Sequence, residues 1–518
     1  MSDSTPVRHY LTGICPPARG CALAELVRAH PAPVWLVVAE DLTTAEHLAE
    51  DTRFFHTAAG ATTPLSVLLF PESLADRPDM REAFAASNDR LTVLSRLRAL
   101  RHRSETPDRL VVVTTPAALL QPVPALEEFA TRELTLRRGQ AQSFTGLLEQ
   151  LQALDYDSEA VCEAPGHYAI RGGIIDLYPV TANRPYRLDF FGDEIEDIRA
   201  FDPVTQRSAE SVESIQVPAT PRVKLADSST GLADYLSPAS ALVFVEPSTL
   251  EEEFRTFAGG SEAALAPLRH KCRLHFGLAD LDEASALLAG PEHEATWDTE
   301  SLAHHRRYPA DALIAQERLQ VETEARGEFL RQLATWRVAG YGLCLVSAKE
   351  GEEQRIREIL DQENLRRPLH PRFLRGTLNE GFRITFHRDT PELAWTEGSG
   401  PRGLVIATET EIFGRRRPRR PAVNPRAIAH RARIDQLLDF SELVEGDFVV
   451  HLQHGVAYYR GLTKLDTAQG TREVISLEFD DQVTLHVPLQ ESHLVSRYVG
   501  LSKTRPQLGR IGSGRWEK

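Results

Sequence analysis

The sequence lacks any long apolar run. Among its 518 residues we find no stretch apolar enough to cross a bilayer as a helix. The N-terminus, MSDSTPVRHY, also lacks the apolar core of a secretory signal peptide. We therefore expect a cytoplasmic protein without membrane contact.

Cysteine pairs are absent as well. The five cysteines are scattered and form no CxxC pair, which argues against a disulfide framework and against a zinc site. A reducing cytoplasm suits this distribution best. The residues are Cys15, Cys21, Cys162, Cys272 and Cys344.

Basic charge is in deficit, because 59 Lys and Arg face 74 Asp and Glu, giving a formal net charge of −15. This balance argues against a large general nucleic-acid surface and favours protein partners. The composition, 42% hydrophobic and 26% charged, is that of a globular chain. Its length predicts roughly three to five domains.

The N-terminal part has an α/β pattern. Residues 34–39 form a continuous apolar run, typical of a strand buried on both faces, and a helix capped near Thr43 or Thr44 follows. Strands at 67–70 and 110–113 flank a helical segment at 83–101. This alternation predicts a parallel sheet.

A helicase-like sheet would place a phosphate loop early, and the candidate is Gly13–Cys21. It fits GxxxxGK[ST] poorly, because Cys21 stands in place of the lysine and Ala22 in place of the Mg²⁺-binding hydroxyl. Two prolines also remove amide groups that would cradle a phosphate. We interpret the loop as a lost nucleotide site; an ordinary loop is the alternative.

The α/β pattern resumes further along the chain. A helix at 143–154 leads into a β region, and a buried strand at 241–245 with a helix at 249–257 follows it. A long helical pattern at 310–337 precedes a smaller α/β unit with strands at 342–346 and 404–407 and a helix at 352–362. The run Arg415–Arg420 is then either a solvated loop or a phosphate-binding segment.

The β region Gly166–Ser208 is a meander of short strands separated by Gly and Pro turns. Along residues 186–191, Arg187 and Phe191 share the outward face. An exposed aromatic beside an arginine is typical of a protein interface, although Phe191 could instead join a second small core.

The runs RGGIIDLYP, YRLDFFGDEIEDIRAFDP and TQRS closely resemble the small β domain shared by the excision-repair helicase UvrB and the transcription–repair coupling factors (Mfd). In both families that domain docks UvrA. The resemblance implies a UvrA contact through Arg171, Arg187 and Phe191. It also fits the degenerate loop, since the UvrB-like module of Mfd lacks a working ATP site.

From residue 446 the pattern is all-β, with a hairpin around Asp480–Gln482. His451 and His454 lack a third metal ligand nearby in the sequence, which favours local hydrogen bonding over a metal site. The runs VVHLQHGVAYYRGL and LHVPLQESHLVSRY resemble the CarD-type module of Mfd, an SH3-like barrel that binds the β subunit of RNA polymerase. The resemblance points to Leu465 at that contact; closure of the barrel core is the alternative.

No intact Walker A motif and no motor-like run occur in the sequence, so it matches only the front half of the Mfd family. Either the chain is truncated or the motor is a separate chain. We expect no cofactor in this chain. ATP and Mg²⁺ belong to the missing motor, which would also supply most double-stranded-DNA binding. The masking C-terminal domain of full-length Mfd is missing too, so we expect constitutive UvrA binding.

The expected fold class is multidomain α/β plus β. It comprises a degenerate helicase-like α/β domain with an inserted small β domain, a second small α/β domain and a C-terminal SH3-like (CarD/Tudor-like) barrel. The expected segments are 1–125 and 218–338 (UvrB-like α/β), 126–217 (UvrA-binding-like), 339–425 (small α/β), 426–442 (linker), 443–502 (polymerase interaction) and 503–518 (start of the motor linker).

Three functions follow from these features. The first is a transcription-coupled repair scaffold that binds stalled RNA polymerase and recruits UvrA. The second is a UvrB-like ATPase acting on damaged DNA. The third is a transcription regulator that binds RNA polymerase without a repair role.

Overall fold

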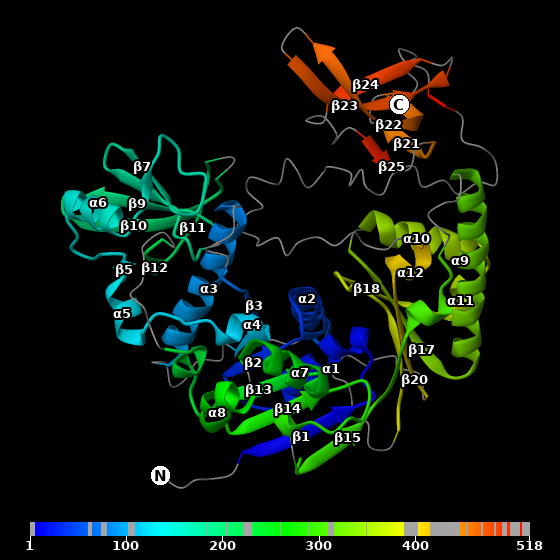
Figure 1. Cartoon of the computed structure of the whole chain (residues 1–518). Coiled ribbons are helices and arrows are strands. Elements are labelled where there is room, and N and C mark those ends of the chain that lie inside the picture. Colours follow the sequence, from blue (N-terminus) through cyan, green and yellow to red (C-terminus); the bar gives the residue numbers. More distant parts are fainter. Residues whose placement is uncertain are drawn as a thin grey trace.

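The structure is a computed structural model, and Figure 1 shows its arrangement. It describes residues 6–60, 65–73, 80–101, 109–182, 184–203, 206–220, 230–258, 261–288, 290–308, 315–348, 350–387, 402–414, 446–451, 454–467, 470–480, 483–488, 495–497 and 508–509. The Arg415–Arg420 run and the expected linker at 426–442 lie outside these ranges.

A seven-stranded parallel sheet forms the first α/β unit, and its strands come from both sides of residues 133–218. Its central strands are apolar throughout and buried, as the sequence predicts. In sheet order the strands are β15 (His293–Thr296), β1 (Val7–Thr12), β14 (Leu274–Leu278), β13 (Ala241–Val245), β2 (Val34–Val38), β4 (Arg109–Thr114) and β3 (Leu65–Phe70).

Helices cover both faces of this sheet. One face carries α1 (Arg19–Ala29) and α2 (Leu42–Ala58). The other carries α3 (Met80–Arg101), α4 (Pro116–Leu120), α5 (Leu126–Thr131), α7 (Pro247–Ala258) and α8 (Ser261–Lys271). The cap of α2 is Asp41, whose carboxylate accepts the amide of Thr44 at 2.7 Å, so the helix begins slightly earlier than predicted.

The inserted β domain branches from this unit through two paired antiparallel strands, β5 (Glu133–Arg137) and β12 (Ser214–Pro218). Beyond them lie α6 (Phe144–Ala153) and a six-stranded sheet. Ser143 caps α6, as the sequence predicts. The sheet order is β11 (Ser208–Ser211), β10 (Glu194–Phe201), β9 (Tyr186–Phe191), β8 (Ile174–Leu177), β7 (His167–Arg171) and β6 (Asp157–Ser158).

The second α/β unit begins earlier than the expected boundary at residue 339. Its five-stranded sheet takes in β16 (Asp298–Ser301), and α9 (Ala315–Val338) packs in its core. The sheet order is β16, β19 (Phe382–Thr385), β20 (Gly403–Thr408), β17 (Tyr341–Ser347) and β18 (Arg372–Arg375), covered by α9, α10 (Glu350–Gln362), α11 (Arg366–Leu369) and α12 (Glu409–Phe413).

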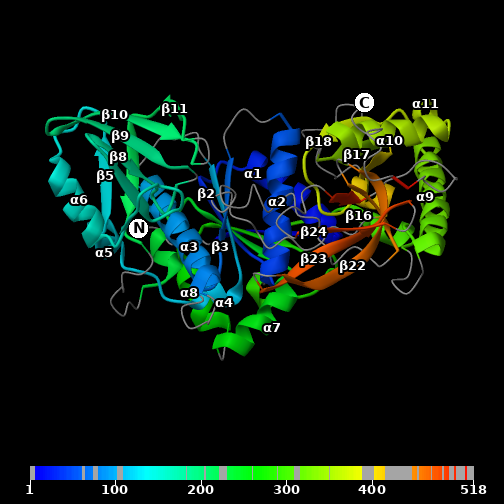
Figure 2. The ribbon, with the colours of Figure 1, turned by 90° about the horizontal axis from the view of Figure 1, so that it is seen from above.

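The two α/β units share one apolar core. Phe55 of α2 packs against Phe382 of β19, with ring centroids 5.9 Å apart. Asp51 of α2 accepts hydrogen bonds from the backbone and side-chain nitrogens of Asn379, at 3.1 and 2.9 Å. Figures 1 and 2 show the second unit and the inserted domain on opposite sides of the seven-stranded sheet.

The C-terminal module is a five-stranded antiparallel sheet with its own small core. The predicted hairpin is present, closed by the amide of Phe479 donating to the carbonyl of Val483 at 2.8 Å. The sheet order is β24 (Thr484–Pro488), β23 (Gly470–Glu478), β22 (Gly455–Thr467), β21 (Phe448–His451) and β25 (Val495–Arg497). Among the described helices, none is long and apolar enough to span a bilayer.

Candidate functional site

The six-stranded sheet has two unlike faces. One is closed by α6, β5 and β12 around an apolar core that contains Leu188, Ile175 and Ile198. The opposite face carries a cluster of four residues, Cys162, Ala169, Tyr178 and Phe201, and beside it a set of charged side chains. Burial among these neighbours raises the pKa of the Cys162 thiol, so this cysteine stays neutral.

Two tight turns fix where the predicted contact residues end up. Gly172–Gly173 joins β7 to β8 and Gly192–Asp193 joins β9 to β10, with Gly172 and Gly192 in the left-handed region. Because β8 pairs antiparallel with both of its neighbours, β7 and β9 run in the same direction and finish at the same end of the sheet. Arg171 is the last residue of β7 and Phe191 the last residue of β9, so both lie at that end, with β8 between them.

Phe191 is the most exposed aromatic side chain of this domain, at 79% of its free surface. The opposite face does hold a second small cluster, but Phe191 is not part of it. The alternative that Phe191 is buried there is therefore wrong. Its ring lies at the end of β9, next to the Gly192–Asp193 turn, and is accessible to a partner.

Arg187 lies on the same face but is largely enclosed. Its Nε and Nη2 donate to the two carboxylate oxygens of Asp176 at 2.7 and 2.9 Å, and its guanidinium lies 4.9 Å from the ring centre of Phe201. The bonds to Asp176 raise the pKa of Arg187 above its ordinary value. Its Nη1 donates to Ser208 Oγ at 3.4 Å, and 15% of the side chain is exposed.

Asp176 anchors the charged face and was not singled out from the sequence. Its side chain is fully buried, and Arg171 Nε also approaches it, at 3.8 Å. The signal was present, since an aspartate stands between Ile175 and Leu177 in an apolar strand. Its partner was not visible, because pairing of Asp176 with Arg187 depends on the β8–β9 register.

Further ion pairs tie the outer strands to this face. Arg199 of β10 bonds to Asp189 of β9 and lies 3.5 Å from Asp197. Arg171 Nη2 donates to Gln206 Oε1 at 3.3 Å. The face therefore presents alternating charges in fixed positions, with Arg171 and Phe191 as its accessible edge.

The C-terminal module offers a different kind of surface. β21 pairs only with residues 455–458 of β22, and β24 only with residues 474–478 of β23. Within the described residues, the far end of the β22–β23 hairpin therefore has two unpaired outer edges. Leu465 pairs with Arg472 in this hairpin arm, defined as residues 462–467 and 470–473; only its backbone is described.

His451 and His454 stack on each other with ring centroids 4.7 Å apart, and both rings contact Phe479 edge-on. In the described ranges, no three His, Cys, Asp or Glu residues are grouped so that they could hold a metal ion.

The Gly13–Cys21 loop is closed off by protein contacts. The amides of Gly13 and Ile14 donate to the carbonyls of Asp280 and Ala279, at 3.1 and 3.0 Å. The amide of Cys15 donates to Thr299 Oγ1 at 2.8 Å, a contact from the second α/β unit. These three backbone amides are therefore paired with protein oxygens.

α2 packs against the helix that follows this loop. A Cβ added at Gly20 would meet the Cβ of Asp51 at 2.5 Å, so the start of α1 is covered by α2. Cys21, where a phosphate-loop lysine would stand, is fully buried.

A basic group on the second unit was also missed from the sequence. Arg357, Arg366, Arg367 and His370 surround one pocket on α10 and α11. The basic run LRRPLHPRFLR contains Arg366, Arg367 and His370, but only the denser Arg415–Arg420 run was considered as a phosphate-binding segment.

Two sequence profiles match the chain, and each falls on one of the surfaces just described. The UvrB interaction domain matches residues 134–221, which is the inserted β domain. The CarD-like/TRCF RID domain matches residues 443–499, the C-terminal module.

Similarity to curated proteins extends over nearly the whole chain. The transcription-repair-coupling factor of Myxococcus xanthus is 25% identical, covering 97% of this chain and 46% of its own length. Those of Bacillus subtilis and Escherichia coli are 22% and 25% identical, covering 98% and 96% of this chain. The chain spans about half the length of these relatives.

Proposed function

We propose, on the premise that this chain corresponds to the N-terminal region of the transcription–repair coupling factor (Mfd) family, that it is a scaffold for transcription-coupled DNA repair. Its inserted β domain recruits UvrA, and its C-terminal module binds the β subunit of RNA polymerase. The observation that carries the proposal is the exposed Phe191, which ends β9 at the same end of the sheet where Arg171 ends β7, within the region matched by the UvrB interaction domain.

At the UvrA contact, Phe191 acts as the apolar anchor. A large aromatic side chain that is exposed in the free protein contributes most when a partner buries it in a pocket. Arg171, with 42% of its side chain exposed, adds charge-assisted hydrogen bonds to carboxylates of UvrA. Arg187 contributes its Nη1 edge and otherwise fixes the charged face.

Rigidity of this face favours binding. Asp176 holds Arg187 by two hydrogen bonds and lies within ion-pair distance of Arg171. Because these side chains are already ordered, less conformational entropy is lost when UvrA binds.

For RNA polymerase, the hairpin arm provides the contact. Its unpaired outer edges accept an added strand from the partner, and Leu465 supplies an apolar side chain at that junction. The SH3-like, CarD/Tudor-like barrel expected for this module is part of the same proposal.

The first α/β unit is proposed to be a helicase-like domain that serves as a support and binds no ATP. Its loop amides are occupied by protein oxygens, which argues against the UvrB-like ATPase. In the complete family protein, ATP, Mg²⁺ and double-stranded DNA are handled by the motor, which releases the stalled polymerase.

Titration of UvrA with this chain at fixed salt tests the recruitment role. We expect saturable binding that weakens by about 2 kcal/mol or more in Phe191→Ala, because the anchor is removed. Leu281→Ala is the matched control, since Leu281 is also exposed, at 66%, but lies on the first α/β unit. Arg171→Ala should weaken binding as well, whereas Arg138→Ala, an equally exposed arginine near β5, should not.

Failure of the unmodified chain to bind UvrA would contradict the recruitment role and leave the polymerase-binding regulator. Equal loss in Phe191→Ala and Leu281→Ala would show that UvrA binds elsewhere.

A further inference from the structure

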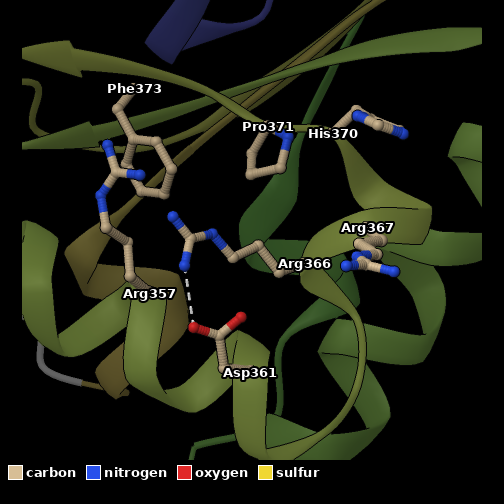
Figure 3. Close-up of a pocket in the computed structure, with 7 residues that line it drawn as sticks. All are labelled: Arg357, Asp361, Arg366, Arg367, His370, Pro371 and Phe373. Atoms are coloured by element: carbon tan, nitrogen blue, oxygen red, sulfur yellow. Dashed lines mark hydrogen bonds and ion pairs between the residues drawn. The ribbon is translucent and has the colours of Figure 1, made fainter.

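A concave basic pocket lies on the second α/β unit, between α10, α11 and β18 (Figure 3). Its volume is about 500 Å³, within the range of small-ligand sites. It lies outside both profile-matched regions, 134–221 and 443–499. The lining residues are Arg357, Asp361, Arg366, Arg367, His370, Pro371 and Phe373.

The arginines reach this pocket from two helices. Arg357 extends from α10 and is held in place, because its Nε and Nη2 donate to Glu353 Oε1 at 3.1 and 2.6 Å and its guanidinium stacks 4.0 Å from the ring centre of Phe373. Its Nη1 forms none of these bonds. Arg366 extends from α11 toward Arg357, as Figure 3 shows.

Several donors around the pocket have no acceptor among the described residues. Within the same residues, the Arg366 side chain makes a single hydrogen bond, from Nη1 to Asp361 Oδ2 at 2.9 Å. In the described part of the chain, the side chains of Arg367 and His370 form no hydrogen bond or ion pair. Three guanidinium groups thus surround one cavity against a single lining carboxylate, in a chain whose net charge is −15.

His370 helps to shape the opening. It caps α11 in the left-handed conformation, with φ of 42°, and this turns the chain into Pro371 and β18. The imidazole and the Arg367 guanidinium therefore lie on the side of the pocket opposite Arg357 (Figure 3).

We propose that this pocket binds a phosphate group. Guanidinium groups bind phosphate oxygens through paired, charge-assisted hydrogen bonds. A terminal phosphate offers three acceptor oxygens and close to two negative charges, and a backbone phosphodiester offers two free oxygens and one charge. Either can bridge guanidinium groups that line one pocket from two helices. The phosphate group belongs either to a free polyphosphate or to a nucleic-acid backbone. Without it, Asp361 accepts the hydrogen bond from Arg366.

Calorimetric titration of the whole chain with inorganic pyrophosphate at fixed ionic strength tests the site. We expect saturable binding that weakens at least about tenfold in Arg366→Ala/Arg367→Ala, since charge-assisted hydrogen bonds are lost. Asp361→Asn should bind pyrophosphate more tightly than the unmodified chain, because it removes the competing carboxylate. The control Arg28→Ala/Arg138→Ala removes the same charge from exposed arginines elsewhere and should bind normally.

A second arm, anisotropy with a short labelled DNA duplex, separates the two sources. Duplex binding that pyrophosphate competes away, and that Arg366→Ala/Arg367→Ala loses, identifies a backbone phosphate. Pyrophosphate binding without a duplex effect identifies a free polyphosphate. The proposal is overturned if neither probe binds, if the double variant binds like the unmodified chain, or if the control variant loses as much affinity.

Discussion

The buried carboxylate of Asp176 determines the state of the charged face. It is fully enclosed and receives two hydrogen bonds from Arg187, a side chain with only 15% exposure. Taking two charges out of water is costly unless each satisfies the other. The pair is therefore more sensitive to loss of one partner than any exposed ion pair in this sheet.

Asp176→Asn should loosen this sheet locally. It leaves Arg187 without its counter-charge, and we expect the free energy of local opening to fall by about 3 kcal/mol. Hydrogen exchange of peptides spanning residues 167–201 measures this directly. Asp193→Asn, in the exposed β9–β10 turn, is the control and should exchange like the unmodified chain. Equal protection in both variants would show that the pair does not stabilise the sheet.

Alternation along a strand predicts which face of the sheet a residue lies on, but not how exposed its side chain is. It placed Arg187 and Phe191 on one face, and the structure shows them there. Alternation did not predict that Arg187 is enclosed and Phe191 exposed. Arg187 is enclosed by residues of β8 and β10, and the sequence of β9 alone does not show how those strands pair with it.

Among the secondary-structure elements, the hairpin arm of β22 and β23 has the clearest consequence. A two-stranded ribbon without neighbours is marginal in isolation, so a partner strand would stabilise it. Lys464 precedes Leu465 in β22 and pairs with Glu473 in the backbone register, so it offers a neighbouring control position.

Leu465→Gln should weaken binding to RNA polymerase about tenfold or more if Leu465 lies at the contact. Lys464→Gln, at the neighbouring position of β22, should bind normally. Pull-down or interferometry with purified polymerase core enzyme measures both variants. Normal binding by Leu465→Gln would favour the alternative that Leu465 completes the core of its own module.

Elements with strong apolar patterns were predictable, and those without them were not. The strands β2 and β13 are apolar at every position and were found from the sequence. β16, with the sequence DTES, has no apolar alternation and was missed. It forms only because β19 pairs with it at the edge of the second sheet, which moved that unit's start ahead of residue 339.

At the scale of the whole molecule, the two α/β units behave as one block around the Gly13–Cys21 loop. Trp297 lies between β15 and β16, and Thr299 lies in β16 of the second unit; both contact the loop from outside the first sheet. No sequence pattern predicts that the Gly13–Cys21 loop is covered in this way, because the contacts depend on how the two sheets pack against each other.

ATP with Mg²⁺ should not stabilise the chain. A ligand at a hundred times its dissociation constant adds about 2.7 kcal/mol of stability, so true binding would raise the unfolding temperature visibly. The measurement belongs in the Arg366→Ala/Arg367→Ala variant, so that the proposed phosphate pocket does not contribute. A clear rise with ATP in that variant would contradict the lost nucleotide site and revive the ATPase hypothesis.

The chain enters and leaves the inserted domain through one pair of neighbouring strands. β5 and β12 are paired along their length, and the amide of Ala219 donates to the carbonyl of Arg132 at 2.8 Å at their base. Because of this two-stranded connection, the domain can be inserted or replaced without changing the strand order of the seven-stranded sheet. The same β domain can therefore be carried by different scaffolds, each of which keeps its own sheet.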